Sequence, residues 1–256
     1  MPNLSEIPVS KYLKILAKGE PGTRKSVESA CFPKPMYIFD LDGKLDVLKK
    51  HYPRETGIEV DTYESPYNEK DIQYLFARLN SKLEEIQVNC KYSTVILDSL
   101  TALVNHVLAY TLSYRGKEGK SIGKIQLPEW DDFNGESAVL QKIVAFAKSI
   151  PCNTILIAHV TPDAKGITRR LFTAGRQAAV MIPALFNEVY HFQSILGTNG
   201  ELKYEVSTKN TGTDFARSAL TLPERIDISG KEGNLFNEIM KAKELMERTN
   251  KAQVLK

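Results

Sequence analysis

The stretch GEPGTRKS, residues 19–26, decides how the rest of the chain is interpreted. It has nearly the form G-x-x-x-x-G-K-[ST], a loop whose backbone N–H groups surround phosphate oxygens while the following helix directs its positive end at them. Gly19 and Gly22 suit positions where a side chain would occupy phosphate space or where φ is positive. Arg24 stands where the last glycine of the pattern belongs. Because the string alone is unspecific, its meaning depends on its surroundings.

The loop lies between a segment typical of a strand and a short segment typical of a helix. Residues 11–18 (KYLKILAK) run straight into glycine, as a strand entering a turn does. After the loop, KSVESACF offers about two helical turns before Pro33 and Pro35 stop them. MYIFD (36–40) is then a second candidate for a buried strand. The predicted order is strand, loop, helix, strand, which is the setting that a phosphate-binding loop requires.

The remaining sequence alternates between helix-type and strand-type segments. Apolar residues at three- and four-residue steps predict helices over 71–88 and 136–150, and apolar runs predict buried strands over 92–98 and 153–159. Beyond about residue 186 the pattern becomes more alternating, as in antiparallel strands. We therefore expect an α/β fold with a mostly parallel central sheet flanked by helices, and with antiparallel strands added toward the C-terminus.

Length and composition fit one domain with a sizeable core. The chain has 256 residues, of which 42% are hydrophobic. We expect one domain over residues 1–230, followed by a C-terminal helix and basic tail over 231–256. No run of about 18 apolar residues occurs, and the N-terminus has no apolar segment behind a basic start. We therefore expect no membrane span, no secretory signal and a cytoplasmic location.

The three cysteines and the net charge carry little functional information. Cys31, Cys90 and Cys152 are widely spaced and odd in number, which argues against a zinc site or a disulfide framework. The formal net charge of +3 does not by itself predict a nucleic-acid partner.

The 19–26 loop supplies the residues that a nucleotide and Mg²⁺ need. Lys25 would neutralise the β- and γ-phosphates, and the Ser26 hydroxyl would ligate Mg²⁺. Asp98 ends a buried strand, where its carboxylate can hold the water shell of that ion. The alternatives are an ordinary turn for GEPG and an N-cap role for Asp98. The full set of predicted nucleotide contacts is Gly19, Glu20, Pro21, Gly22, Thr23, Arg24, Lys25 and Ser26.

Arg24 leaves the strength of nucleotide binding open. It adds a bulky cation beside the expected phosphates in place of a glycine. Three outcomes follow: an altered loop that binds weakly, a charge-compensated loop that still binds, or no binding.

The order of the motifs resembles that of a known family. GEPGTRKS, YIFDLDG, VILDSLTAL, TILIAH and YEVSTKN follow one another as in the RecA-type P-loop ATPase core, most closely the phage-encoded RecA-like ATPases of Sak type used in single-strand annealing recombination. The similarity covers about residues 11–225 and rests on order and spacing, since each motif is short. It implies a RecA-like P-loop NTPase that uses ATP and Mg²⁺, binds single-stranded DNA and forms a ring or filament of identical subunits. A single-strand-binding protein is a further candidate partner, and the location would be the cytoplasm of a host cell if the chain is phage-encoded.

The resemblance also implies catalytic roles beside that of Lys25. Asp42 would be the carboxylate that activates the attacking water, one methylene shorter than the family's glutamate, unless it is a turn residue before Gly43. His159 would stand at the position of a γ-phosphate sensor, unless it is a satisfied histidine at a strand end. Lys209 would reach the γ-phosphate of a neighbouring subunit as an arginine finger does, with Arg217 as a second candidate. An exposed surface lysine is the alternative for Lys209.

Two basic segments are candidate contacts for single-stranded DNA. The resemblance implies the first, residues 161–183, where arginines would meet phosphates and an aromatic ring would stack on a base. The second, residues 110–132, reads as a long loop, which is typical of a functional or a disordered segment. Solvated basic loops are the alternative for both. The candidate residues are Arg169, Arg170, Phe172 and Arg176 in the first segment and Arg115, Lys117, Lys120 and Lys124 in the second.

Three functions from different classes remain open at this point. The first is an ATP-dependent recombination or annealing ATPase that binds single-stranded DNA. The second is a degenerate nucleotide-binding protein with little hydrolysis that acts as an assembly or regulatory partner, which the departures at Arg24 and Asp42 favour. The third is a P-loop enzyme of different chemistry, such as a small-molecule kinase, for which the sequence offers no separate acceptor site or lid.

Overall fold

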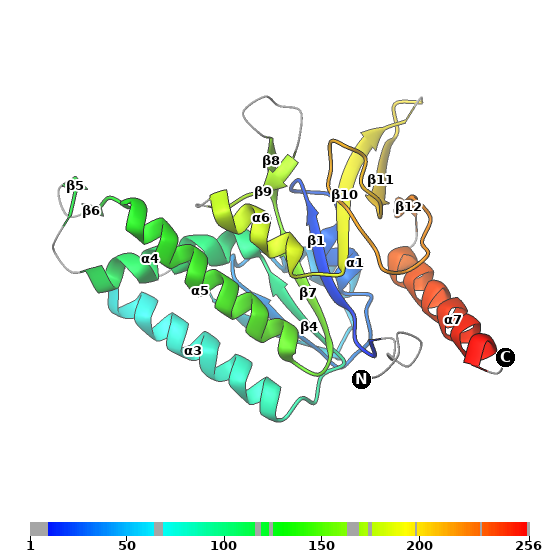
Figure 1. Ribbon diagram of the computed structural model, residues 1–256, viewed down its shortest axis with the longest axis horizontal. Helices are drawn as coiled ribbons and strands as arrows, with labels where there is room; N and C mark the ends of the chain where they lie inside the picture. Colours follow the sequence, from blue (N-terminus) through cyan, green and yellow to red (C-terminus); the bar gives the residue numbers. More distant parts are fainter. Residues whose placement is uncertain are drawn as a thin grey trace.

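Eight strands form one central sheet in the part of the chain that the structure describes. The computed structural model describes residues 10–63, 69–115, 119–122, 125–162, 169–173, 176–197, 199–230 and 232–254, with the backbone alone at 69, 125, 169, 176–177 and 250–254. The strand order is β12-β11-β10-β1-β7-β4-β2-β3 (Figure 1). The strands are β1 (Lys14–Gly19), β2 (Met36–Asp40), β3 (Ile58–Thr62), β4 (Thr94–Asp98), β7 (Asn153–Ala158), β10 (Glu188–Leu196), β11 (Leu202–Ser207) and β12 (Arg225–Asp227).

The sheet is mostly parallel and carries its antiparallel strands at one edge. Every pairing among β3, β2, β4, β7, β1 and β10 is parallel. The C-terminal strands β11 and β12 then pair in antiparallel fashion with their neighbours. All residues of β2 and β4 are buried, as expected of apolar strands covered on both faces. The predicted α/β fold is therefore confirmed.

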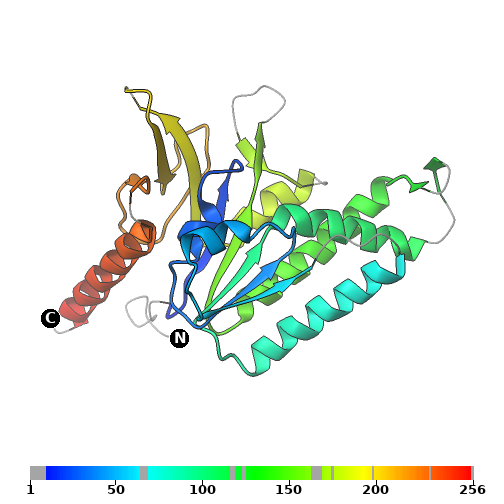
Figure 2. The ribbon, with the colours of Figure 1, turned by 180° about the vertical axis from the view of Figure 1, so that it is seen from behind.

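Helices cover both faces of the sheet. They are α1 (Lys25–Ser29), α2 (Asp46–His51), α3 (Glu69–Val88), α4 (Leu100–Arg115), α5 (Trp130–Ser149), α6 (Arg176–Ala184) and α7 (Asn234–Val254). Helices α3 to α6 lie on the face toward the viewer in Figure 1, and α1 and α2 on the face toward the viewer in Figure 2. The sheet has a hydrophobic core on each face, and successive residues of a strand point into different cores. In β1, Leu16 packs in one core, whereas Ile15 and Ala17 pack in the other together with Leu235 of α7. No described helix combines the length and the apolar content that a membrane crossing needs.

The two segments predicted as loops contain regular structure, so that part of the prediction is wrong. Helix α4 continues to Arg115, a short hairpin of β5 (Ser121–Ile122) and β6 (Ile125–Gln126) follows, and α5 begins at Trp130. A capping box between Glu129 and Asp132 starts α5 earlier than the apolar pattern indicates. In the other segment, β8 (Val160–Pro162) and β9 (Arg169–Leu171) pair as a hairpin that buries Val160 against Leu171, and α6 follows.

The chain order brings the motif residues to one edge of the sheet. Strands β1, β2, β4 and β7 are parallel, so their carboxyl ends lie side by side. The 19–26 loop leaves β1 at this edge, and Asp98 and His159 stand at the ends of β4 and β7. In open α/β sheets ligands bind in the crevice outside the carboxyl ends of the strands. The candidate site therefore lies at this edge of the sheet.

Candidate functional site

The backbone of the 19–26 loop has the special conformations that its glycines suggest. A Cβ atom at Gly19 would lie 2.2 Å from the carbonyl oxygen of Phe192, so only glycine fits beside β10. Gly22 has φ +77°. Arg24 also has a left-handed conformation, with φ 66° and ψ 16°, in the place of the missing glycine. A non-glycine residue adopts this region at a cost of about 1–2 kcal/mol, so other contacts must hold Arg24 there.

The Arg24 side chain supplies those contacts. Its Nη1 donates to the carbonyl oxygens of Ile228 (2.8 Å) and Ser229 (3.0 Å), and its Nη2 lies 3.4 Å from Oε1 of Glu232. The guanidinium also lies over the ring of Tyr204, 5.6 Å from its centroid. The cation expected beside the phosphates is thus paired with the chain that leads into α7.

Lys25 is buried inside the loop. Its ammonium donates to the carbonyl oxygens of Gly19 (3.0 Å) and Glu20 (2.6 Å) and to Oγ1 of Thr23 (3.3 Å). Burial lowers the pKa of Lys25 to about 8, although Asp98 and Glu20 favour the charged form. The loop therefore holds a desolvated cation, whose attraction for an anion is stronger than that of an exposed lysine.

Ser26 and Asp98 meet although 71 residues separate them in the sequence. The Ser26 hydroxyl donates to Oδ2 of Asp98 at 2.5 Å. Burial, helped by the nearby Asp42, raises the pKa of Asp98 to about 6, while Ser26 and Lys25 act in the opposite direction. The alternative of an N-cap does not apply to Asp98, because Oγ of Ser99 accepts the N–H of Ala102 at the start of α4.

These donors fit a Mg²⁺ ion that also contacts phosphate. Mg²⁺ in nucleotide sites is usually held by one or two carboxylates or hydroxyls together with substrate oxygens and water. The Ser26 hydroxyl and the Asp98 carboxylate form such a pair. Among the described residues no group of three or more His, Cys, Asp or Glu side chains could hold a metal.

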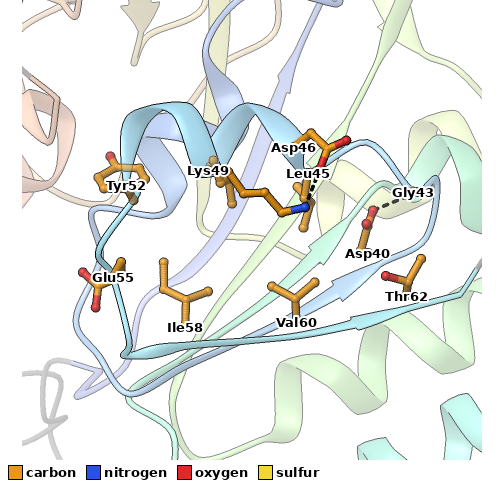
Figure 3. A pocket seen from close by; sticks show the side chains of 11 residues that line it. Asp40, Gly43, Leu45, Asp46, Lys49, Tyr52, Glu55, Ile58, Val60 and Thr62 are labelled. Carbon is orange, nitrogen blue, oxygen red and sulfur yellow. Dashed lines mark hydrogen bonds and ion pairs between the residues drawn. The ribbon is translucent and has the colours of Figure 1, made fainter.

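One carboxylate, that of Asp40, ends β2 and a second, that of Asp42, follows the strand, and the two have different partners. Oδ1 of Asp40 accepts the N–H groups of Gly43 (2.9 Å) and Lys44 (3.3 Å), so Asp40 stabilises the turn. Asp40 lines a cavity of about 420 Å³ between α2 and β3, and the side chains of Ile58 and Val60 also point into this cavity (Figure 3). Asp42 instead lines the cavity beside the 19–26 loop, with Oδ2 3.9 Å from Nζ of Lys44.

The cavity beside the loop has a volume of about 590 Å³ and is called here the loop cavity. Its wall includes residues 21–27, Asp42, Asp98 and His159. The backbone N–H of His159 donates to Oγ1 of Thr101, and its buried Nδ1 has no hydrogen-bond partner in the described part of the chain. Burial and the neighbouring Lys25 lower the pKa of His159. The His159 ring thus lines the loop cavity, its Nδ1 is buried, and burial favours the uncharged imidazole.

The two candidates for a residue acting across a subunit boundary differ in environment. Lys209 is exposed and follows β11, which runs antiparallel to β10 and so leads away from the loop cavity. Arg217 is half-buried, and its guanidinium donates to the carbonyl oxygens of Pro183 and Ala184 at the end of α6 and of Phe186 beyond it. Arg217 is thus engaged within its own chain, whereas Lys209 is exposed to solvent.

The candidate DNA residues lie in two separate places. Arg170 and Phe172 are exposed on and beside β9, above the sheet in Figure 1, while the β5–β6 hairpin lies far from them at the ends of α4 and α5. Lys120 is exposed at this hairpin. Arg115 is not, because it pairs with buried Asp132 and donates to the carbonyl oxygen of Leu127. The side chains of Arg169 and Arg176 lie outside the described part of the structure, as do Lys117 and Lys124 entirely.

Sequence reasoning missed residues that reach the loop cavity from other elements. Tyr204 on β11 and Val47 and His51 on α2 line it. Neither α2 nor its contact with the loop has a periodic pattern to reveal it, because the helix is short. Glu28 was also missed: it is fully buried in α1, where an acidic residue ordinarily signals a solvated face.

No protein-family model matches the chain, and no curated protein matches its sequence. The chemical character of the site comes from its own residues. A buried ammonium, a hydroxyl, two carboxylates and a neutral imidazole surround one cavity at the carboxyl ends of parallel strands.

Proposed function

We propose that the protein binds a nucleoside triphosphate, with ATP as the preferred candidate, together with Mg²⁺ in the loop cavity. The observation that carries this proposal is the hydrogen bond between Ser26 and Asp98 at 2.5 Å, formed by the residue that follows the buried Lys25. A bound phosphate chain needs a desolvated cation, backbone N–H groups and a place for Mg²⁺, and Lys25 with the Ser26–Asp98 pair suits the first and the last of these needs. Glycine at position 19 and the left-handed residues 22 and 24 support the same interpretation of the loop.

Hydrolysis of the γ-phosphate is the reaction that the surrounding groups favour. Asp42 would accept a proton from the attacking water, and its place on the cavity wall allows this. His159 would donate a ring N–H to a γ-phosphate oxygen, and burial favours the uncharged form of its ring. Lys25 would hold the β- and γ-phosphates while charge develops on them. Mg²⁺, when bound, supplies further positive charge at the same oxygens.

Single-stranded DNA is the proposed partner, and one hydrogen bond supports a link between DNA and turnover. The N–H of Phe172 donates to the carbonyl oxygen of His159 at 3.0 Å. The candidate stacking residue is thus bonded directly to the candidate phosphate sensor. A base stacked on Phe172, with Arg170 at the backbone, would bias the position of His159. The exposed Lys209 supports assembly into an oligomer in which hydrolysis needs a neighbour.

The test is steady-state ATP hydrolysis with and without single-stranded DNA. Lys25→Ala serves as the blank, and Lys50→Ala, an exposed lysine on α2, serves as the matched control. We expect turnover that DNA stimulates, a loss of about 100-fold or more in Lys25→Ala, and wild-type behaviour in Lys50→Ala. Rates equal in wild type and Lys25→Ala, from folded samples, would contradict the hydrolysis proposal.

Nucleotide binding without turnover is the second candidate function. It is favoured by Asp42, because an aspartate reaches less far than a glutamate and its Oδ2 faces Lys44 at 3.9 Å. Binding of a fluorescent ATP analogue separates the two candidates. A Kd in the micromolar range that Lys25→Ala weakens, without measurable hydrolysis, would favour a nucleotide-gated assembly partner.

A further inference from the structure

The residue that departs from the loop pattern is joined to a distant part of the chain. Arg24 bonds the carbonyl oxygens of Ile228 and Ser229 and pairs with Glu232. We call residues 228–230 and 232–233, which lead into α7, the α7 lead. The Arg24 side chain is only 14% exposed, so these interactions are partly shielded from water. They connect the phosphate-binding candidate loop to the C-terminal helix.

A second connection runs in parallel from the helix that follows the loop. Glu28 in α1 is fully buried, and its carboxylate oxygens accept the N–H groups of Gly233 (3.2 Å) and Leu235 (3.4 Å). These amides belong to the first turn of α7 and its preceding residue, where backbone donors have no partner within the helix. Burial raises the pKa of Glu28, while the two amides favour the ionised form. Glu28 thus caps the first turn of α7 from α1, the helix that follows the 19–26 loop.

A third polar connection and an apolar contact also link α1 and α2 to the start of α7, and we call this set of contacts the joint. Nδ1 of His51, at the end of α2, lies 3.1 Å from Oε1 of Glu232, the same oxygen that Arg24 approaches. His51 also lines the loop cavity. Phe32, just after α1, packs on Phe236 of α7 with ring centroids 4.9 Å apart. The start of α7 is therefore held by α1 and α2, and also by β12, since Nδ2 of Asn234 donates to the carbonyl oxygen of Asp227.

We propose that Arg24 is a positioning residue: it holds the 19–26 loop from the α7 lead, so that nucleotide affinity and the order of the α7 lead are coupled. The inference rests on the proposed nucleotide binding and adds a regulatory partner within the chain. The left-handed backbone of Arg24 costs free energy that its anchored guanidinium offsets, whereas glycine would adopt this conformation freely. By linkage, whatever the α7 lead contributes to nucleotide affinity, the nucleotide returns to the α7 lead.

The test compares three substitutions at Arg24 with one elsewhere. Arg24→Gly removes the anchor and relieves the backbone, Arg24→Ala removes the anchor and keeps the backbone cost, and Arg24→Lys keeps a cation. Arg54→Ala is the matched control, because Arg54 is exposed. Two quantities are measured in each variant: the Kd for a fluorescent ATP analogue with Mg²⁺, and hydrogen exchange of the Gly233 and Leu235 amides with and without saturating ATP.

We expect the wild type to exchange these two amides several-fold more slowly when ATP is bound. Arg24→Gly and Arg24→Ala should weaken ATP binding by about five- to tenfold, the usual size of a coupling between sites, and should lose the ATP-dependent protection. Arg24→Lys should restore part of both effects, and Arg54→Ala should match the wild type. If Arg24→Ala proves unstable, Glu232→Gln tests the same joint and should shift both quantities in the same direction by less.

Two results would overturn the coupling alone. One is a wild type that binds ATP without any change in exchange at Gly233 and Leu235. The other is an Arg24→Gly variant that binds ATP as tightly as the wild type, or more tightly, and keeps the protection. A wild type that does not bind ATP at all would instead overturn the proposed function, and the coupling with it. A purely structural role for Arg24 would lower stability in every variant but leave ATP-dependent protection intact.

Discussion

The loop cavity and the β5–β6 end of the molecule both contain cations, but the two regions use them differently. At the loop cavity, Lys25 is buried, its pKa is lowered to about 8, and buried Asp98 lies opposite. At the β5–β6 end, Lys120 is exposed to solvent, and Arg115 is paired with Asp132. Removing a charge from water raises the free energy of its ionised form, so a buried cation attracts an anion strongly. Water screens an exposed charge, and an ion pair compensates a buried one. Counting basic residues therefore says less about binding than knowing which of them are buried and which are paired with a carboxylate.

The largest expected effect separates a structural cation from a DNA contact. Arg115→Ala should lower the free energy of unfolding by about 2 kcal/mol, because it leaves the buried Asp132 carboxylate without its partner. Thermal or urea unfolding measures this change, and Lys120→Ala is the control that should leave stability unchanged. Affinity for single-stranded DNA should fall no more in Arg115→Ala than in Lys120→Ala at a temperature where both are folded. A selective loss of DNA binding in a stable Arg115→Ala protein would break the comparison.

The next effect tests the buried charges of the loop cavity through pH. Asp98 must be ionised to hold Mg²⁺ and has a pKa of about 6, and Lys25 must be protonated and has a pKa of about 8. We expect kcat/KM for ATP to fall roughly tenfold per pH unit below about 6 and above about 8, since this ratio reports the free protein. A profile that is flat between pH 5 and 9 would contradict the roles of both residues.

On the acid side, the free energy of unfolding should change with pH in the direction opposite to kcat/KM. Burial raises the pKa of Asp98 in the folded protein above the value of about 3.9 for an unfolded chain. Between about pH 4 and pH 6 the folded state therefore binds more protons than the unfolded state, and the free energy of unfolding falls as pH rises through this window. Asp98→Asn should remove this contribution, while Asp46→Asn on the exposed side of α2 should retain it.

The smallest expected effect sharpens the comparison at an exposed aromatic residue. Phe172 is 43% exposed beside β9, so its ring is available for stacking. Phe172→Ala should raise the Kd for single-stranded DNA by about fivefold, equivalent to about 1 kcal/mol, and should reduce DNA stimulation of hydrolysis. Phe172→Tyr keeps the ring and should behave as the wild type in a fluorescence anisotropy titration. Equal affinities of Phe172→Ala and the wild type would remove Phe172 from the DNA surface.

Much of the fold was predictable because its strands are short apolar runs. The central residues of β2, β4 and β7 are apolar, and burial on both faces of a parallel sheet accounts for that composition. The predicted loops failed where contacts distant in sequence create order. Arg115 with Asp132 joins two helices, and Val160 with Leu171 closes a hairpin. Neither contact leaves a periodic signal in the sequence.

The candidate site divides in the same way. Lys25, Ser26 and Asp98 were predictable, because a loop after one parallel strand and a carboxylate at the end of another must meet at the same edge. The turn role of Asp40 was not predictable in this way, because it depends on the turn in which Asp40 accepts two N–H groups. Tyr204 and His51 arrive from elements that no motif announces.

The sequence by itself determined that a glycine-containing loop joins a buried strand to a helix in an α/β sheet, because strand burial and glycine conformation are local properties. Only the tertiary structure decided what the one irregular residue of that loop does. Arg24 looks from the sequence like an added phosphate contact, yet its guanidinium bonds to carbonyl oxygens 204 and 205 residues away. A long side chain can reach many partners, and packing of α7 against α1 determines which of them lie within its reach.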